Sequence, residues 1–301
     1  MIRVENVSKS FDNITALNDF SLNVKKGSIY GLVGTNGSGK TTIIKHLTGV
    51  FIPDRGSITI NGKNIYENLA VKEKIGYIPD NLSYYAPYSL NDIEKYYKNI
   101  YKLWNHDRFV EMIEKFDLNK NTKINRLSKG MQKQAAFCII MSCLPEYLIL
   151  DEPIDGLDPI VRKLLWKYIV EDVASREMTC LISSHNLREM EGICDCIGIV
   201  DKGHMVLERD LDELKSDIHK LQVAFKNITD DIENIYSKLN ILHREKRGSV
   251  DLLIVRNPKE TVDALITAYQ PVLYDLLPLT LEEIFIYELG GEHGDIAEIL
   301  F

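Results

Sequence analysis

Long hydrophobic runs are missing from this chain of 301 residues. The longest apolar stretch, residues 135–144, is about half the length that a membrane-spanning helix needs. Residues 1–20 also lack the charged and then apolar pattern of a leader peptide, because Arg3, Glu5 and Asp12 interrupt it. We therefore expect a cytoplasmic chain that has no membrane span of its own and could dock on a membrane partner.

Positive charge is outnumbered by negative charge. Lysines and arginines number 36 against 44 aspartates and glutamates, which leaves a formal net charge of −8. Nucleic-acid binding relies on clustered positive charge, and no basic block offsets the acidic balance. We therefore expect no nucleic-acid partner.

Cysteines are few, and their total is odd. The five are Cys138, Cys143, Cys180, Cys194 and Cys196, and all have apolar neighbours in the sequence. Only the last two stand close together, and no further ligands follow at the spacing of a metal site. We expect small buried side chains in a reducing compartment rather than zinc ligands.

Residues 34–41, Gly-Thr-Asn-Gly-Ser-Gly-Lys-Thr, are the most informative segment. A strand-like apolar run at 29–33 precedes it, and residues 42–47 have helical spacing. Glycines let backbone N–H groups point at an oxyanion, and the helix adds the positive end of its dipole. The segment therefore predicts a nucleoside-triphosphate site in which Lys40 reaches the β- and γ-phosphates and Thr41 binds Mg²⁺. The candidate binding residues are Gly34, Asn36, Gly37, Ser38, Gly39, Lys40, Thr41 and Thr42.

Strand-like and helical stretches alternate up to about residue 210. The strand-like runs are residues 2–7, 21–24, 57–60, 75–78, 147–150, 180–183 and 197–200, and residues 159–175 are helical. Such alternation predicts an α/β core with a largely parallel sheet. A helical block from about 85 to 145 would be a subdomain inserted in this core.

The pattern changes after about residue 211. Strands are expected at 220–225, 241–245, 250–255 and 272–276, helices at 230–239 and 260–269, and a last helix at 281–289. The order βαββαβ predicts a small ferredoxin-like α+β domain over residues 211–301. No ligand motif indicates its role, and dimerisation or regulation are both open.

Further segments have groups suited to phosphate chemistry. The apolar strand at 147–150 leads into Asp151, suited to the Mg²⁺ shell, and Glu152, suited to orient or deprotonate the attacking water. The same acids could instead favour a helix N-terminus through its dipole. At the end of another strand, the imidazole of His185 can sit against a γ-phosphate, although it could also be an ordinary loop histidine.

Residues 127–131, Leu-Ser-Lys-Gly-Met, form a second candidate phosphate-binding surface, called here the signature segment. The Ser128 hydroxyl and the Gly130 amide stand at the start of a helical run, where an anion is favoured. Ser128 could also act only as a helix cap. An aspartate-containing loop at 155–159 follows the strand that ends in Asp151.

Along the chain the order is phosphate loop, signature segment, Asp151-Glu152, the loop at 155–159 and His185. These five features in this order resemble the ATP-binding-cassette (ABC) ATPases over residues 1 to about 210. The resemblance implies a P-loop α/β fold with a helical subdomain, and hydrolysis of ATP with Mg²⁺. Phe11 would stack on adenine, although an aromatic residue there could also belong to the core. Asp80 stands where most relatives have a glutamine that contacts Mg²⁺ and water, so coupling to nucleotide should be altered there rather than lost.

Two residues of the signature segment differ from the usual family pattern, and they indicate a subfamily. Lys129 and Met131 replace glycine and glutamine in the usual signature, and this pattern is similar to ATPase subunits of bacterial ABC-2-type exporters for antibiotic and bacteriocin resistance. Residues 281–285 are also similar to the closing helix of those subunits. The transported substrate is not indicated by the sequence.

The family pattern also implies partners. Ser128 and Gly130 would close over ATP held by a second cassette, either another copy or a paralogue, in a head-to-tail dimer. The helical block near Tyr84, Tyr85 and Tyr88 would receive a coupling helix of separate transmembrane permease subunits, which would place the chain on the inner face of the cell membrane. A soluble ABC ATPase or a nucleotide-gated regulator is the alternative.

Overall fold

The structure is a computed structural model in which residues 1–82, 88–226 and 230–289 are described. They fall into two compact units, each with its own sheets and helices. The first contains residues 1–185 and 192–208, and the second contains residues 186–191 and those from 209 onward. Among the described helices, none is long and apolar enough to cross a membrane.

The centre of the first unit is a six-stranded sheet in the order β10-β9-β3-β8-β7-β6. The pairs among β9, β3, β8, β7 and β6 are parallel. Every residue of β3 and β7 is buried, because parallel strands covered on both faces need continuous apolar runs. The bounds are β3 Ile29–Val33, β6 Ile75–Ile78, β7 Tyr147–Asp151, β8 Thr179–Ser184, β9 Cys196–Asp201 and β10 His204–Asp210.

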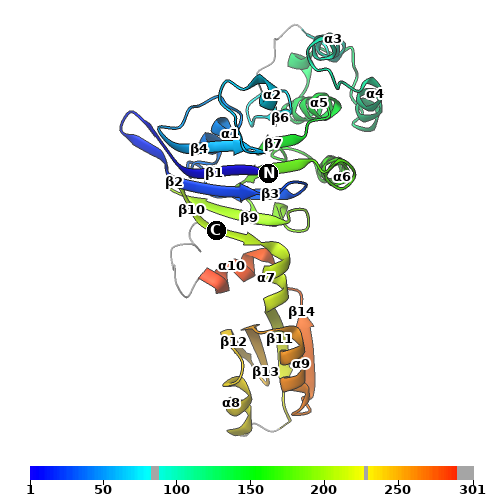
Figure 1. The fold of residues 1–301 in the computed structure, drawn as a ribbon. Coiled ribbons are helices and arrows are strands. Elements are labelled where there is room, and N and C mark those ends of the chain that lie inside the picture. Colours follow the sequence, from blue (N-terminus) through cyan, green and yellow to red (C-terminus); the bar gives the residue numbers. More distant parts are fainter. Residues whose placement is uncertain (83–87, 227–229, 290–301) are drawn as a thin grey trace. The chain divides into compact units, whose positions relative to one another are not determined.

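A second sheet of this unit is antiparallel and has the order β2-β1-β4-β5. Its strands are β1 Ile2–Phe11, β2 Ile14–Val24, β4 Arg55–Ile60 and β5 Lys63–Asn64. Phe20 and Leu22 from this sheet share one hydrophobic core with Ile44 of helix α1 and Leu181 of β8. The phosphate-loop helix is therefore packed between the two sheets (Figure 1).

The helices of the first unit are α1 Lys40–Leu47, α2 Leu69–Lys72, α3 Leu90–Ile100, α4 His106–Lys115, α5 Lys129–Ser142 and α6 Pro159–Arg176, with a short 3-10 turn η1 Ile124–Arg126. The helices α3, α4 and α5 gather at one end of this unit, beyond β6 and β7 (Figure 1). Polar caps begin several of them. Ser89 and Asp92 form a capping box at α3, and Asp158 caps α6 with Pro159 in its first turn.

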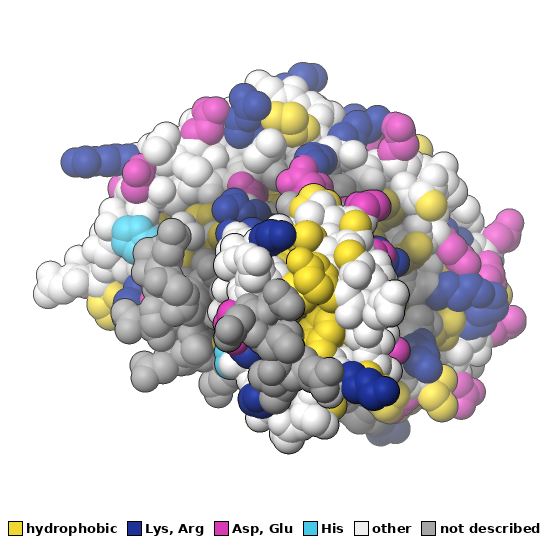
Figure 2. Space-filling view, turned by 90° about the horizontal axis from the view of Figure 1, so that it is seen from below, with side chains coloured by type: hydrophobic (Ala, Val, Ile, Leu, Met, Phe, Trp, Pro, Cys, Tyr) yellow, Lys and Arg dark blue, Asp and Glu magenta, His cyan; other side chains and the backbone are white. Residues whose placement is uncertain are grey.

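The second unit contains η2 Leu187–Glu189, α7 Leu211–Asp217, β11 Ile218–Ala224, α8 Asp230–Tyr236, β12 Ile241–Arg247, β13 Val250–Arg256, α9 Lys259–Thr267, β14 Leu273–Leu277 and α10 Leu281–Leu289. Its sheet is antiparallel in the order β12-β13-β11-β14. Leu221, Val223 and Leu253 of the sheet pack with Ile235 of α8 and Val262 of α9. The predicted ferredoxin-like order of elements is confirmed. Figure 2 shows a stripe of hydrophobic side chains, with Lys and Arg side chains near its two ends.

The α/β class and the parallel core sheet agree with the sequence prediction, but several elements were missed. The pattern predicted strands only at 2–7 and 21–24, whereas β1 reaches Phe11 and β2 begins at Ile14. Irregular register between these two strands breaks the alternation of buried and exposed residues, which explains the missed residues. The strand β10 and the short helices α2 and α7 were not predicted.

The five cysteines are free thiols, and Cys138, Cys143, Cys180 and Cys194 are buried. Burial raises the pKa of Cys143 to about 12, so its thiol stays protonated. Within the described residues the three-ligand cluster suited to a metal is Glu152, Asp155 and His185, which contains no cysteine.

Candidate functional site

The loop between β3 and α1 has a backbone that depends on glycine. Gly37 and Gly39 have φ angles of 82° and 113°, in the region that side chains with a Cβ rarely adopt. Gly34 has no room for a side chain, because a Cβ there would lie 2.3 Å from the carbonyl oxygen of Val200. The loop therefore turns sharply from β3 into the N-terminus of α1.

This loop forms one side of a hollow of about 250 Å³. The α1 N-terminus opens into it, which makes it a favourable place for an anion. Its wall also includes three residues at the start of β2 and two carboxylates from other elements. The lining residues are Ile14, Thr15, Ala16, Asn36, Gly37, Gly39, Lys40, Thr41, Thr42, Asp80 and Glu152.

Lys40 is the buried cation of this hollow. Only 5% of the residue is exposed, and its Nζ donates to the carbonyl oxygens of Gly34 at 2.7 Å and Thr35 at 3.1 Å. The same Nζ lies 3.4 Å from Oε1 of Glu152. Nearby, the Ser38 hydroxyl is buried and has no hydrogen-bond partner in the described structure. An anion in the loop would offer acceptors to both groups.

Three strands deliver the acidic groups and their hydrogen-bond partners to one edge of the sheet. Asp151 ends β7, is 1% exposed, and accepts a hydrogen bond of 2.6 Å from the Ser183 hydroxyl of β8. Glu152 follows directly, and its Oε2 lies 3.1 Å from Nδ1 of His185, which follows β8. Asp80, two residues after β6, lines the same hollow. The parallel register of these strands explains the meeting, because their carboxyl ends share an edge.

The acidic groups at this edge of the sheet affect the pKa of Tyr77 of β6. Burial, together with the negative charges of Asp151 and Asp80, raises the pKa of Tyr77 to about 12. The phenol therefore stays neutral and adds no charge beside the carboxylates. Positive charge comes from Lys40 and from Lys133 of α5, whose Nζ donates to Oδ1 of Asp80 at 3.2 Å.

Ser128 and Gly130 lie elsewhere. Ser128 is the N-cap of α5, and its hydroxyl accepts from the backbone N–H of Met131 at 3.2 Å. Gly130 stands close to the loop after β7, because a Cβ on it would lie 3.1 Å from the Gly156 carbonyl oxygen. Neither residue is among the described residues that line the phosphate-loop hollow.

Phe11 stands at the end of β1 and is 39% exposed. It pairs with Ile14, the first residue of β2 and part of the hollow's wall. Its ring is 5.2 Å from that of Phe51, and the Nζ of Lys9 lies 5.5 Å from its centre. Phe11 is therefore a partly exposed aromatic residue near the hollow, not a fully buried core residue.

Two groups of residues at this site were missed from the sequence. The first is Ile14, Thr15 and Ala16, which reach the hollow because β2 turns back beside β1. The second is Lys133, five residues after Ser128. A lysine two positions before the apolar run 135–144 was the available signal, and residues 133–142 are all buried.

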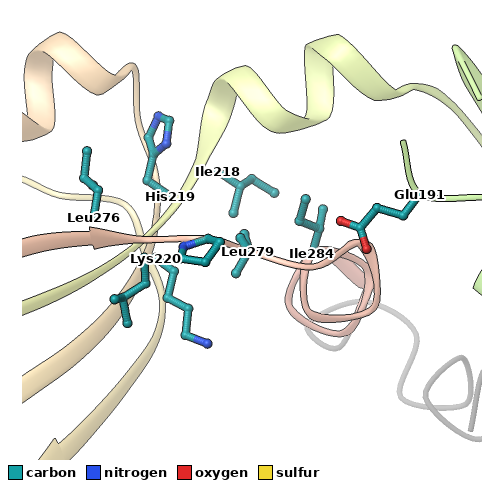
Figure 3. A pocket seen from close by; sticks show the side chains of 9 residues that line it. Glu191, Ile218, His219, Lys220, Leu276, Leu279 and Ile284 are labelled. Carbon is teal, nitrogen blue, oxygen red and sulfur yellow. The ribbon is translucent and has the colours of Figure 1, made fainter. Parts of the chain in front are cut away.

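Of the predicted tyrosines near the helical block, Tyr84 and Tyr85 lie outside the described residues. Tyr88 is described and is 47% exposed. A separate hollow of about 290 Å³ lies in the second unit, between β11, the residues after β14, and α10 (Figure 3). None of the predicted site residues is among those that line it.

Comparison with known proteins agrees with these features. Residues 17–155 match the family described as ABC transporter. The chain is 31% identical over 292 residues to the ABC transporter ATP-binding protein YtrB of Bacillus subtilis (strain 168), covering 97% of this chain and 99% of the relative. It is 34% identical over 230 residues to the lantibiotic transport ATP-binding protein SrtF of Streptococcus pyogenes, covering 75% and 99%.

A solved ATP-binding subunit of an ABC transporter superimposes with a TM-score of 0.66 at 27% identity, covering 71% of this chain and 92% of that one. The similar sequences and the similar solved structure thus indicate the same family as the five sequence features. The nucleotide-binding fold, the ATPase activity and the role as a transporter subunit agree with the prediction, and the alternative role without transport is not supported. The chain belongs to the ABC transporter ATP-binding proteins.

Proposed function

We propose that this chain drives export by closing with a second cassette around two ATP molecules and hydrolysing them. The observation that supports this most directly is the meeting of Lys40, Glu152 and His185 beside the phosphate loop, with 3.4 Å and 3.1 Å between the groups. A degenerate, non-hydrolysing cassette would not need this arrangement. The name of a similar protein, a lantibiotic transport ATP-binding protein, supports a role in transport.

In the proposed site the loop residues bind the phosphates. The amides of Gly37, Ser38 and Gly39 precede the N-terminus of α1, and Lys40 supplies the buried cation. The contacts of Lys40 with the Gly34 and Thr35 carbonyls would be exchanged for phosphate oxygens. Gly34 permits the sharp turn, Asn36 and Thr42 line the hollow, and the exposed ring of Phe11 would stack on the adenine.

The donors here fit Mg²⁺, which prefers oxygen ligands. Thr41 and Asp80 both line the hollow, and Asp151 stands at the end of the neighbouring strand. We propose these three as its ligands, directly or through water. The cation would neutralise charge on the phosphate oxygens. Asp80, in place of the usual glutamine, adds a negative charge to this donor set.

Glu152 and His185 have the proposed catalytic roles. The Glu152 carboxylate is 12% exposed, so it can orient a water molecule in a partly dry site. Nδ1 of His185 lies against its Oε2, which leaves the rest of the imidazole free to meet a γ-phosphate. Glu152 would thus act on the attacking water, and His185 would act on the γ-phosphate.

The position of Ser128 and Gly130 supports a dimer. Both stand at the N-terminus of α5 but do not line their own phosphate-loop hollow. A two-fold, head-to-tail pairing would bring the signature segment of each cassette to the loop of the other and complete both sites at once. The partner would be a second copy or a paralogous ATPase subunit.

Transport also requires membrane subunits, which this chain does not supply from its described helices. We propose that separate permease subunits dock on the helical block at about 85–145 and hold the cassette on the inner face of the cell membrane. Residues 1–210 would be the nucleotide-binding domain. Residues 211–301 would be an accessory domain.

The clamp is tested with Glu152→Gln, which should bind ATP without hydrolysing it. We expect this variant to elute as a dimer in gel filtration with ATP and Mg²⁺, and as a monomer with ADP. Glu171→Gln, at an exposed position in the C-terminal part of α6, is the matched control and should hydrolyse ATP as the wild type does. A Glu152→Gln chain that stays monomeric with ATP, or that still hydrolyses it, would contradict the proposal. Co-purification from membranes with a permease tests the transport role.

A further inference from the structure

Lys133 is a lysine buried in helix α5, where a charged side chain is unusual. It lies on the buried face of α5, and its side chain is only 10% exposed. Burying a lysine costs free energy unless its charge is paired and hydrogen-bonded. The side chain does have such partners, and both belong to the proposed catalytic site.

The first partner is the backbone of Glu152. Nζ of Lys133 donates to the Glu152 carbonyl oxygen at 2.7 Å. Glu152 has a φ of 46°, a left-handed conformation that a non-glycine residue keeps only where its surroundings impose it. Its N–H donates to the Ser183 hydroxyl at 3.1 Å. Lys133 therefore bonds the carbonyl oxygen of Glu152, and Ser183 bonds its N–H. Together they fix the backbone conformation that sets the direction of the Glu152 side chain.

The second partner is Asp80, whose Oδ1 accepts from Nζ of Lys133 at 3.2 Å. Asp80 lines the phosphate-loop hollow and is 43% exposed, so Lys133 makes the buried link between this carboxylate and the Glu152 loop. A glutamine at position 80 would offer a neutral oxygen and a weaker pairing. The acidic residue at 80 and the lysine at 133 therefore complement each other.

We propose that Lys133 is a positioning residue for ATP hydrolysis, which fixes the backbone of Glu152 and aligns it with Asp80. The inference rests on the function proposed above, in which Glu152 orients the attacking water. Lys133 itself touches neither water nor phosphate in this scheme. It also stands one turn into the helix that Ser128 begins, so α5 connects the surface offered to the second cassette with the chain's own Glu152.

The test compares Lys133→Met with Lys133→Arg. Small displacements of a catalytic group lower the rate strongly, so we expect kcat of the methionine variant to fall by about 10- to 100-fold. The KM for ATP should change by less than about 3-fold, because the phosphate loop is untouched. Arginine can reach both oxygens and should restore most of the rate. Lys167→Met, which removes an exposed lysine paired with Glu171, should leave kcat unchanged.

Two further variants separate positioning from folding. In a Glu152→Gln background, Lys133→Met should still give an ATP-dependent dimer, because Ser128 and Gly130 keep their places. Asp80→Asn should lower kcat, and adding it to Lys133→Met should cost less than the product of the two single effects. Loss of the ATP-dependent dimer, or fully multiplicative effects, would overturn the inference.

A wild-type rate in Lys133→Met would also overturn it, as would equal losses in the methionine and arginine variants. If instead Glu152→Gln itself retains hydrolysis, the proposed function fails first. The two failures are therefore distinguishable.

Discussion

At the scale of single residues, the phosphate loop depends on backbone positions that exclude a side chain. Gly39 has a φ of 113°, and a Cβ on it would lie 2.9 Å from the Ala16 carbonyl oxygen. Gly62 also has a positive φ, 73°, but a Cβ there would meet nothing within 4 Å. The two glycines thus separate the effect of backbone strain from that of crowding at the site.

We expect Gly39→Ala to weaken ATP binding by at least about 10-fold and to destabilise the chain by about 1–3 kcal/mol, because strain and a close contact add. Gly62→Ala should cost about 1 kcal/mol through strain alone and leave ATP binding unchanged. Titration with a fluorescent ATP analogue and thermal unfolding measure the two effects. Equal ATP affinities in the two variants would contradict the expectation.

His46 of α1 gives a pH-dependent effect at the same scale. Burial lowers its pKa below the ordinary value of 6.5, against the opposing effect of its hydrogen bond with the Thr42 carbonyl. Lys9 also disfavours the charged ring, and Asp54 favours it. The neutral imidazole is therefore the form that the folded state prefers.

Below pH 6.5 the unfolded chain binds a proton at His46 that the folded chain does not bind. The free energy of unfolding should therefore fall as pH drops below about 6.5, until the lower folded-state pKa is passed. His46→Gln should remove this part of the slope, whereas His204→Gln, at an exposed histidine, should keep it. Urea unfolding between about pH 5 and 8 measures it. An unchanged slope in His46→Gln would refute the assignment.

At the scale of elements, local sequence signals set the helix ends. Ser89 accepts from the N–H of Asp92, and the Asp92 carboxylate accepts from the N–H of Ser89 at 3.0 Å, which begins α3. The helical block that the sequence predicted from about residue 85 includes this helix, and the structure adds the cap that begins it. The starts of helices α3 and α5 are therefore set by their own capping residues and do not depend on the sheet.

Replacing Ser89 by alanine should destabilise the first unit by about 0.5–2 kcal/mol, because the first turn of α3 loses its cap. Ser175→Ala is the control, since that exposed hydroxyl bonds a carbonyl inside α6 and caps no N-terminus. Thermal unfolding should show the difference, and ATP hydrolysis should be unaffected by either change. A larger loss in Ser175→Ala would rule out the capping explanation.

At the scale of the whole molecule, the described residues build two separate hydrophobic cores. One contains β3, β8 and α1, and the other contains β11, β13, α8 and α9. Their residue sets do not overlap within the described part of the chain. Each unit therefore has its own source of stability.

Leu253 of β13 is fully buried in the second core. Leu253→Ala should destabilise that unit by about 2–5 kcal/mol, through lost burial and a residual cavity. Hydrogen exchange should speed up in β11 and β13 and stay unchanged in β3 and β8. Leu276→Ala, at a leucine that is 37% exposed, should have a much smaller effect. Faster exchange in β3 would contradict the separation of the cores.

The sequence by itself determined the family and most of the elements. Residues 34–41, 127–131 and 151–152 are contiguous segments whose chemistry depends on local backbone and on the element that follows, so they can be read without a fold. The buried strands could be read for a similar reason, since continuous apolar runs predict parallel strands covered on both faces.

Only the tertiary structure decided which of these segments meet. Asp80 and Lys133 are 53 positions apart and pair because β6 and α5 belong to one unit. Residues 14–16 line the phosphate-loop hollow because β2 folds back beside β1. Ser128 does not line this hollow, because it caps the N-terminus of α5. Such contacts depend on sheet order and packing, which long-range burial sets and no local pattern encodes. The phosphate loop and its Lys40 could thus be predicted, but the pairing of Lys133 with Asp80 and with the Glu152 carbonyl oxygen could not.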